Sequence, residues 1–364
     1  MQFIDLKSRH KLIKDQVDSR VQAVMDHGQF ILGPEVRELE QKLAEYTGSK
    51  HCVTVSSGTD SLLVALMALG IGPGDEVITV PYTWISSAEV IALLGATTVF
   101  VDVRPDTWNM DENLLEAAIT EKTKAIMPVS IYGQTPEMDL INEIARKHEI
   151  PVIEDAAQSF GATFKDKRSC NLSSIGSTSF FPSKPLGCYG DAGALFTDND
   201  EWAEKFRWIR VHGQERKHHH PILGLNGRMD TIQAAILLAV LEEFPSEVSS
   251  RARIGSRYSS GLTELQDIAV PVVPPQNTSV YAQYTILSKK RERIQSALKE
   301  QGIPSVSYYT VPLHLQPVFA SLGYNKGDFP VTEEIASSCL SLPMNPYLSE
   351  SDQESVIKTI RTQF

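Results

Sequence analysis

From about residue 50 onward, two kinds of segment with different patterns of hydrophobic and polar residues alternate along the chain. Short apolar runs rich in β-branched residues predict strands, and longer amphipathic segments between them predict helices. The predicted strands are 52–56, 76–80, 97–103, 125–131, 151–154 and 177–181, and the helices among them are 60–70, 86–94 and 137–148. Such alternation, with strands that are apolar along most of their length, predicts an α/β fold whose parallel sheet is covered on both faces.

The pattern changes near Pro245, which is followed by a polar run at 246–251. Two helices are predicted before this point, at 201–211 and 231–243. Beyond it we expect a smaller α+β unit with a strand at 281–287 and helices at 291–301 and 351–361. We therefore predict a large domain, residues 1–245, and a small C-terminal domain, residues 246–364.

Composition narrows the functional classes. The 364 residues are 42% hydrophobic and carry a net charge of −11, which argues against general affinity for nucleic acid or anionic membranes. The four cysteines lie far apart and suggest neither a zinc site nor a disulfide framework. No signal-peptide pattern is present, and the apolar stretches fall short of the ~20 residues that cross a bilayer. We expect a cytoplasmic protein.

Candidate chemistry follows the strands, because ligands of open parallel sheets bind beyond the carboxyl ends of the strands. Gly58 and Thr59 follow the first predicted strand and open a helix, where small residues and the helix dipole suit a phosphate. The alternative is an ordinary helix cap by Ser57 or Thr59. Trp84 follows the second strand and is either a core residue or a platform for a planar ring.

Two further strand ends carry the residues of most interest. Asp155 and, one helical turn later, Gln158 follow the strand at 151–154, and Lys184 follows the strand at 177–181, with Ser179 near its end. A lysine there can hold a carbonyl cofactor as a Schiff base, and a carboxylate can keep a pyridine nitrogen protonated. Asp155 alone is equally well explained as a helix cap. Together the four strand ends predict a pyridoxal 5′-phosphate (PLP) site.

Other readings fit less well. No GxGxxG motif follows the first strand and no Walker phosphate loop is present, so nucleotide-cofactor folds are not indicated. Three successive histidines, His218 to His220, cannot all face one ion from a regular element, and we predict no metal site. His212 and Cys188 are best explained as structural residues.

The motifs resemble those of the DegT/StrS-type nucleotide-sugar aminotransferases, enzymes with the fold type I PLP-dependent transferase architecture. The resemblance spans nearly the whole chain. It implies a large domain with a mainly parallel seven-stranded sheet flanked by helices and a smaller C-terminal α+β domain. The segments that carry it are 28–34, 57–59, 72–77, 154–158, 181–184, 190–193, 226–230 and 233–235.

The resemblance implies a role for each matching position. Lys184 would be the catalytic residue that binds PLP covalently. The cofactor would also be bound by Gly58, Thr59, Trp84, Asp155, Gln158, Ser179 and, from the neighbouring subunit of a homodimer, Asn226. Asp155 would pair with the pyridinium nitrogen, Gln158 with the ring hydroxyl, and Trp84 would stack on the ring. The pocket for the nucleotide sugar would be lined by Gly28, Phe30, Ser183, Arg228, Tyr308 and Tyr309.

The segment 181–191 is closest to the branch of the family that aminates C3 of the sugar. Within this C3 branch, segments 168–172 and 182–189 resemble those of enzymes that convert UDP-2-acetamido-2-deoxy-3-oxo-glucuronate with L-glutamate as amino donor. Those enzymes serve the synthesis of surface polysaccharide such as the O-antigen of lipopolysaccharide. Arg228 would bind a carboxylate through its planar guanidinium. Tyr308 replaces a histidine common in the family, which removes a possible cation beside the substrate carboxylate and leaves a neutral donor. Phe30 replaces a tyrosine, so one hydroxyl is lost. Both changes bear on the identity of the sugar and not on the chemistry.

Three alternatives follow from the same residues. One is an aminotransferase for another 3- or 4-keto nucleotide sugar. A second is a pyridoxamine-dependent sugar dehydratase, against which the lysine at 184 argues, because that class carries histidine there. A third is a non-enzymatic sensor that binds the cofactor without turnover, against which the joint presence of Asp155, Gln158 and Lys184 argues.

Overall fold

A computed structural model describes all 364 residues. Two helices that the pattern analysis did not predict precede the first strand: α1 (Leu6–His27) and α2 (Pro34–Thr47). The alternating part then follows as β1 (His51–Val55), α3 (Gly58–Ala68), β2 (Glu76–Thr79), α4 (Ser86–Leu93), β3 (Thr97–Phe100), α5 (Glu112–Leu115), β4 (Thr123–Ile126), α6 (Met138–Lys147) and β5 (Ile153–Asp155). The large unit ends with β6 (Thr163–Phe164), β7 (Lys167–Arg168), β8 (Ile175–Ser179), β9 (Gly193–Thr197) and α7 (Asp200–Ile209).

The central sheet confirms the predicted fold class. Three strands form the order β3-β2-β4 and four form β5-β8-β9-β1. Parallel bridges between Ile126 and Val152 and between Val129 and Asp155 join β4 to β5, so seven strands make one continuous surface. Only β9 runs against its neighbours, β8 and β1. The sheet is therefore mainly parallel.

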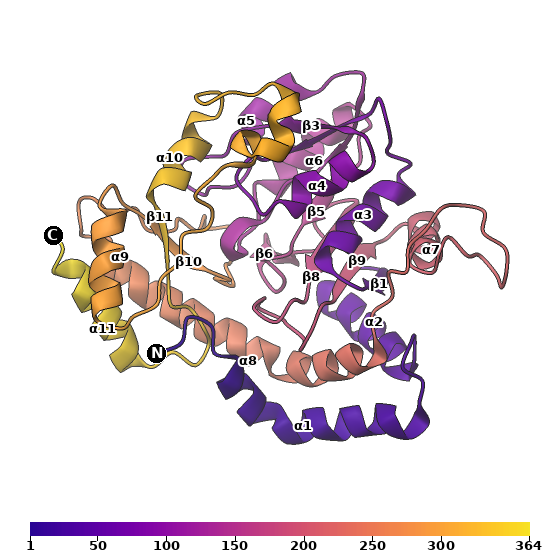
Figure 1. The fold of residues 1–364 in the computed structure, drawn as a ribbon, viewed down its shortest axis with the longest axis horizontal. Coiled ribbons are helices and arrows are strands. Elements are labelled where there is room, and N and C mark those ends of the chain that lie inside the picture. The colour runs from indigo at the N-terminus through magenta and orange to yellow at the C-terminus, as the bar shows by residue number, and fades with distance from the viewer.

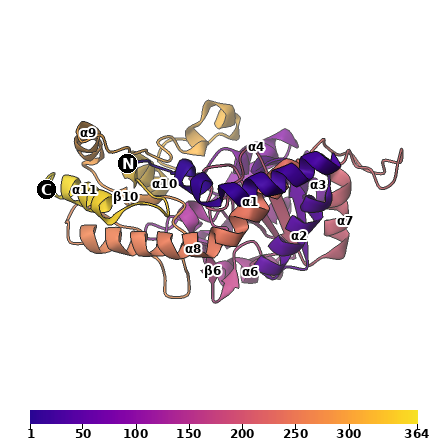
Figure 2. The same cartoon turned by 90° about the horizontal axis from the view of Figure 1, so that it is seen from below.

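Helices cover both faces of the sheet (Figures 1 and 2). Strand β9 shows why, because successive side chains of a strand point to opposite faces. Phe196 belongs to the core formed with α1, α2 and the long helix α8 (Thr231–Leu262). Leu195, one residue earlier, belongs to the core formed with α3 and α7. The layers are thus helix, sheet, helix, as the continuous apolar strands predicted.

Helix α8 corrects one boundary of the sequence analysis. The helix predicted for 231–243 does not end there but runs to Leu262, with Pro245 inside it. A proline within a helix costs about 3 kcal/mol relative to alanine. The burial of Phe244 before the proline and the ion pair of Glu247 with Arg9 after it offset this cost. The predicted domain division between residues 245 and 246 falls inside α8 and stays a prediction.

The C-terminal part contains β10 (Tyr284–Leu287), α9 (Arg291–Glu300), α10 (Pro330–Ser338), β11 (Cys339–Leu342) and α11 (Glu350–Arg361). Strands β10 and β11 pair antiparallel. Their buried faces join the second half of α8 with α9 and α11 around a core that includes Tyr258, Tyr284 and Leu340. None of the helices combines the length and the apolar character that a membrane crossing requires.

Candidate active site

The predicted cofactor residues gather at the carboxyl end of the sheet. Asp155 is the last residue of β5, and Lys184 lies in the turn that follows β8. Strands β5 and β8 are parallel neighbours, so both side chains belong to the same edge, where α/β folds bind their ligands. The charge of Lys184 acts on the pKa of Asp155, and that of Asp155 on Lys184.

The Asp155 carboxylate is buried, with 5% of its surface exposed. Its Oδ2 accepts a hydrogen bond from Ser87 Oγ at 2.7 Å, and its Oδ1 accepts one from the Ala157 N–H at 3.2 Å. Burial raises the pKa of Asp155, although these hydrogen bonds and the charge of Lys184 favour the ionised form. The carboxylate therefore lies where a protonated ring nitrogen would stabilise its charge.

The Lys184 side chain is half-buried and its amine makes neither a hydrogen bond nor an ion pair within the chain. Burial lowers the pKa of Lys184, and the charge of Asp155 opposes that shift. A desolvated amine of this kind is a better nucleophile near neutral pH than a surface lysine. Lys184 thus has the properties required to bind an aldehyde.

The predicted phosphate cradle lies at the N-terminus of α3. The Ser57 side chain caps this helix by accepting from the Asp60 N–H at 3.0 Å, so the capping alternative holds for Ser57. The first two N–H groups of α3, on Gly58 and Thr59, have no carbonyl one turn earlier to bond. Thr59 Oγ1 lies 2.8 Å from Ser86 Oγ. These donors fit a phosphate group.

Gly58 is required because the backbone of α3 passes directly over Ser179 at the end of β8. A Cβ at position 58 would lie 2.5 Å from the Ser179 Cβ and 3.0 Å from its Oγ. No side chain can be accommodated without separating the helix from the strand. This contact brings two predicted phosphate-binding residues together.

Replacing Gly58 by alanine is expected to destabilise the fold by about 1–3 kcal/mol, the usual cost of overpacking. The displaced helix end should also weaken the binding of PLP more than that of pyridoxal, which lacks the phosphate. Thermal unfolding and equilibrium titration with the two compounds measure both effects. Adding Ser179→Gly to the same chain removes the clashing Cβ and should restore stability. Equal losses of affinity for both compounds would contradict the assignment.

Aromatic side chains line the next part of the site. The ring of Trp84 lies 6.0 Å from that of Tyr309, and Trp84 is 56% exposed. It is therefore not a core residue, and its surface is open to a ring. Gln158 accepts from the Tyr132 N–H at 2.7 Å through Oε1 and donates to the Tyr309 hydroxyl at 3.4 Å through Nε2. Its amide is thus fixed between the strand ends and Tyr309.

The sequence analysis did not identify Ser86 and Ser87, which lie at the start of α4. Ser87 binds Asp155 and Ser86 binds Thr59, so this one turn connects the predicted pyridinium partner with the phosphate cradle. Both follow the predicted strand 76–80 closely, but the pattern placed them in the predicted helix 86–94 and did not indicate the direction in which that helix starts. Glu154 was also not assigned a role. It is fully buried and accepts from the Ser169 hydroxyl at 2.6 Å and the Cys170 N–H at 2.8 Å.

The predicted sugar-binding residues form a second group. The Phe30 carbonyl accepts from the Thr231 N–H at 2.9 Å, and Gly227, beside Arg228, accepts from the Ser56 N–H at 3.0 Å. The segments around Gly28 and Arg228 are thus anchored near the start of α8. Within one chain none of Gly28, Phe30, Ser183, Asn226 and Arg228 forms a hydrogen bond with Lys184 or Asp155. Tyr308 joins the site through its carbonyl, which accepts from the Tyr82 hydroxyl at 2.6 Å.

Arg228 and Asn226 have features of unpaired binding groups. The Nε of Arg228 is buried and has no partner in the chain, and Asn226 is exposed. Both follow the loop between α7 and α8 that projects from the molecule in Figures 1 and 2. In this loop His219 pairs with Glu215 and His220 with the His212 carbonyl. No group of three or more histidine, cysteine or acidic side chains is arranged to hold a metal ion.

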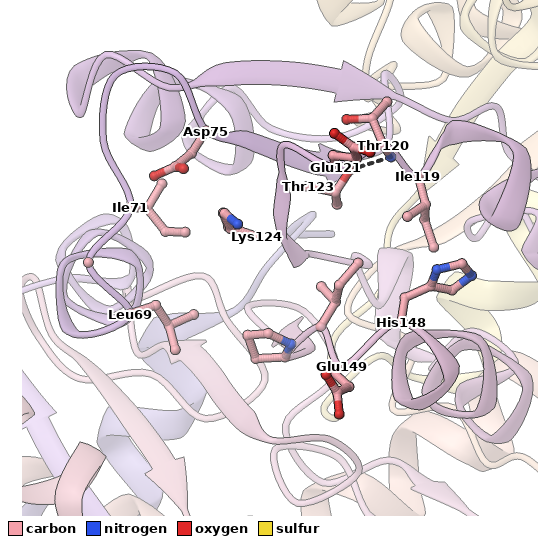
Figure 3. A pocket seen from close by; sticks show the side chains of 13 residues that line it. Leu69, Ile71, Asp75, Ile119, Thr120, Glu121, Thr123, Lys124, His148 and Glu149 are labelled. Carbon is pink, nitrogen blue, oxygen red and sulfur yellow. Dashed lines mark hydrogen bonds between the residues drawn. The ribbon is translucent and has the colours of Figure 1, made fainter.

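A large surface hollow of about 870 Å³ lies elsewhere (Figure 3). It is lined by the turns that lead into β2, β4 and β5, including Asp75, Lys124 and Pro151. It therefore belongs to the amino ends of these strands, at the edge of the sheet opposite Asp155 and Lys184. None of the predicted site residues lines it.

The residues at the carboxyl edge fit PLP on four counts: a half-buried amine without a partner, a buried carboxylate without an ion pair, free N–H donors at a helix start and an open aromatic face. Comparisons with known proteins agree. Residues 11–361 match the DegT/DnrJ/EryC1/StrS aminotransferase family. The chain is 53% identical over 348 residues, 96% of each protein, to the UDP-2-acetamido-2-deoxy-3-oxo-D-glucuronate aminotransferase of Pseudomonas aeruginosa.

Two solved structures show the same fold. A DegT DnrJ EryC1 StrS aminotransferase from Brucella abortus is 43% identical, with a TM-score of 0.97 over 100% of this chain and 99% of the other. NtdA from Bacillus subtilis with bound cofactor PMP is 30% identical, with a TM-score of 0.91 over 99% of this chain and 82% of the other. The predicted fold class and cofactor class are confirmed.

Proposed function

We propose, for a chain that belongs to the DegT/DnrJ/EryC1/StrS aminotransferase family, that its reaction is amination of C3 of UDP-2-acetamido-2-deoxy-3-oxo-D-glucuronate with L-glutamate as donor. The chain is a PLP-dependent nucleotide-sugar aminotransferase. The observation that carries the proposal is the Lys184 amine, without a partner, on the same sheet edge as the buried Asp155 carboxylate. The uronate follows from the Pseudomonas aeruginosa relative and from the unpartnered Arg228 Nε.

When bound, PLP supplies an aldehyde that links to amines and a ring that accepts the electron pair of a breaking C–H bond. The chain supplies the rest. Lys184 Nζ would hold the aldehyde carbon of the cofactor, and as a free amine it would accept the proton that leaves the α-carbon of glutamate. The same nitrogen would deliver a proton to C3 of the sugar. Its lowered pKa suits it to both directions.

Asp155 would keep the ring nitrogen protonated, and the hydrogen bonds from Ser87 and the Ala157 N–H fix the orientation of its carboxylate. Gln158 donates from Nε2 toward the ring hydroxyl, because its Oε1 is occupied by the Tyr132 N–H. Trp84 would cover one face of the ring and exclude water from it. Gly58, Thr59 and Ser179 would bind the phosphate. These assignments are proposals that the contacts described above support.

We assign the rest of each site to a second copy of the chain. Asn226 is exposed, and it follows a loop that leaves the body of the molecule and carries Leu223, 87% exposed. Leu223 is the most exposed of the large apolar side chains of the chain, and burial against a second subunit would remove its apolar surface from water. In a homodimer this loop would bring Asn226 to the phosphate group of the PLP bound by the partner subunit. The predicted cytoplasmic location and a role in surface polysaccharide or O-antigen synthesis belong to the same proposal.

The neighbouring alternatives are less well supported. A sugar dehydratase of this fold carries histidine in place of Lys184, and a non-catalytic sensor does not require the desolvated lysine. An aminotransferase for a different keto sugar would use the same residues with another pocket. Sugar identity is therefore the part of the proposal that requires direct measurement.

The test uses purified enzyme with glutamate and a panel of 3-keto and 4-keto UDP-sugars, both neutral sugars and uronates, with the product identified by mass. We expect the 3-keto uronate to give the highest kcat/KM. Arg228→Gln should then raise KM for the uronate about 10- to 100-fold, the loss of a charge-assisted bond, and leave the neutral 3-keto sugar nearly unchanged. Similar losses for both sugars would show that Arg228 does not bind the carboxylate. Amination of a 4-keto sugar alone would overturn the proposed substrate.

A further inference from the structure

A buried polar cluster that the proposed chemistry does not use lies behind the turn of Lys184. It combines Arg9 of α1, Glu247 of α8 and Tyr347 of the segment before α11. Arg9 and Glu247 are each 4% exposed. Charged side chains that are this deeply buried are costly unless they are paired. The arrangement of their hydrogen bonds shows what the cluster holds.

The Arg9 guanidinium binds two partners, the Glu247 carboxylate and the Pro185 carbonyl. Its Nε donates to Glu247 Oε1 at 2.9 Å and its Nη2 donates to Glu247 Oε2 at 2.6 Å, a two-point ion pair. The same Nη2 donates its second proton to the Pro185 carbonyl at 2.8 Å. Tyr347 donates a hydrogen bond from its hydroxyl to Glu247 Oε1 at 2.5 Å and forms none with Pro185. Glu247 thus fixes the guanidinium, and the guanidinium holds Pro185.

Pro185 is the residue next to Lys184, and its carbonyl receives no other hydrogen bond. Before it, the Lys184 N–H donates to the Phe181 carbonyl at 2.8 Å. After it, the next backbone bond is from the Cys188 N–H to the Phe180 carbonyl at 2.8 Å. Proline has no N–H to donate. The contact from Arg9 is therefore the one polar attachment of the backbone directly after Lys184.

We propose that Arg9 is a positioning residue for Lys184: by holding the Pro185 carbonyl it fixes the direction in which the Lys184 side chain leaves the backbone. This inference rests on the proposed role of Lys184. A lysine at position 9 cannot replace arginine, because one ammonium nitrogen cannot span both Glu247 oxygens and the Pro185 carbonyl with the geometry of a planar fork. Arg9 reaches the turn of Lys184 from the N-terminal helix, and its side chain forms no hydrogen bond with a predicted cofactor- or substrate-binding residue.

The test compares Arg9→Lys with Tyr347→Phe, which removes a hydrogen bond from the same cluster but keeps the contact with Pro185. In the cofactor-free proteins, Lys184 is labelled with pyridoxal and borohydride, and the rate is followed by peptide mass. Hydrogen exchange of the Cys188 amide and thermal unfolding are measured on the same samples. We expect Arg9→Lys to slow labelling about tenfold, since small displacements of a reacting group cost this much or more. Exchange at Cys188 should become faster.

Tyr347→Phe should lower the melting temperature but leave labelling and Cys188 exchange at wild-type values. Equal labelling rates in Arg9→Lys and wild type would overturn the inference. If Arg9→Lys does not fold, Glu247→Gln, which keeps the shape of the side chain but removes its charge, should slow labelling to a smaller extent, and an unchanged rate in that variant would again contradict the proposal. Wild-type protein that is not labelled at Lys184 would instead contradict the proposed function itself.

Discussion

Replacing Lys184 by alanine should lower kcat by about 10⁴-fold, the upper range for removal of an acid–base group, and abolish covalent binding of PLP. The absorbance band of lysine-bound cofactor should disappear, although the phosphate cradle and the Asp155 carboxylate remain. Borohydride treatment followed by peptide mass gives the same answer chemically, because it fixes PLP to wild-type Lys184 and to no residue of the variant. Lys167→Ala, a change of an exposed lysine, should leave both readouts unaltered.

The same amine predicts a pH dependence. Burial lowers the pKa of Lys184 below the ordinary 10.5. A lowered pKa means that the reactive neutral amine is present at lower pH than in a surface lysine. In the cofactor-free protein, the rate of pyridoxal attachment should therefore rise with pH and level off below pH 10.5. A rate that continues to rise through the ordinary lysine range would contradict a desolvated Lys184.

Asp155→Asn should lower kcat about 10²- to 10³-fold, as expected when one preorganised electrostatic contact is lost. Asparagine has the same shape and can retain the Ser87 and Ala157 contacts in part, but it cannot stabilise a protonated ring nitrogen. Covalent attachment to Lys184 should persist, because that bond does not require the charge. Loss of turnover without loss of covalent PLP binding would distinguish the role of Asp155 from that of Lys184. Single-turnover kinetics with glutamate measure the loss of turnover.

Ser87→Ala provides a graded control for Asp155. It removes the 2.7 Å hydrogen bond to the carboxylate but leaves the charge, so the loss of kcat should be much smaller than for Asp155→Asn. A loss as large as that of Asp155→Asn would mean that orientation of the carboxylate, and not its charge, dominates.

The hydrophobic pattern predicted six of the seven strands of the central sheet, all except β9, and the residues at the strand ends, for a clear physical reason. Buried parallel strands are apolar throughout, and their carboxyl ends meet at one edge. Asp155, Lys184 and Thr59 could therefore be grouped without any three-dimensional information. Ser87 was not identified because its role depends on the direction in which α4 starts.

Other parts of the fold could not be predicted from the hydrophobic pattern. Helix α1 buries only Arg9, Ile13, Val17 and Val24 over 22 residues, a stripe too narrow to be recognised. Pro245 signalled the end of a helix that tertiary packing in fact continues to Leu262. The pair of Arg9 and Glu247 joins residues 238 positions apart, and no local spacing indicates such a contact.

The residues proposed for the sugar could be named only by resemblance. Arg228 Nε has no partner within the chain and Asn226 is exposed, and Asn226 is proposed to complete the site of a second copy. The role of each therefore stays a prediction until substrate binding is measured.

The central claim is that nitrogen passes from glutamate to C3 of the sugar through Lys184 and its cofactor. Incubation of the PLP-loaded enzyme with ¹⁵N-glutamate and UDP-2-acetamido-2-deoxy-3-oxo-glucuronate, with mass spectrometry of the nucleotide sugar, tests it directly. The account predicts one ¹⁵N atom at C3 of each product molecule and an equal amount of 2-oxoglutarate. Fully loaded enzyme that yields no labelled sugar, or a sugar labelled at C4, would contradict it.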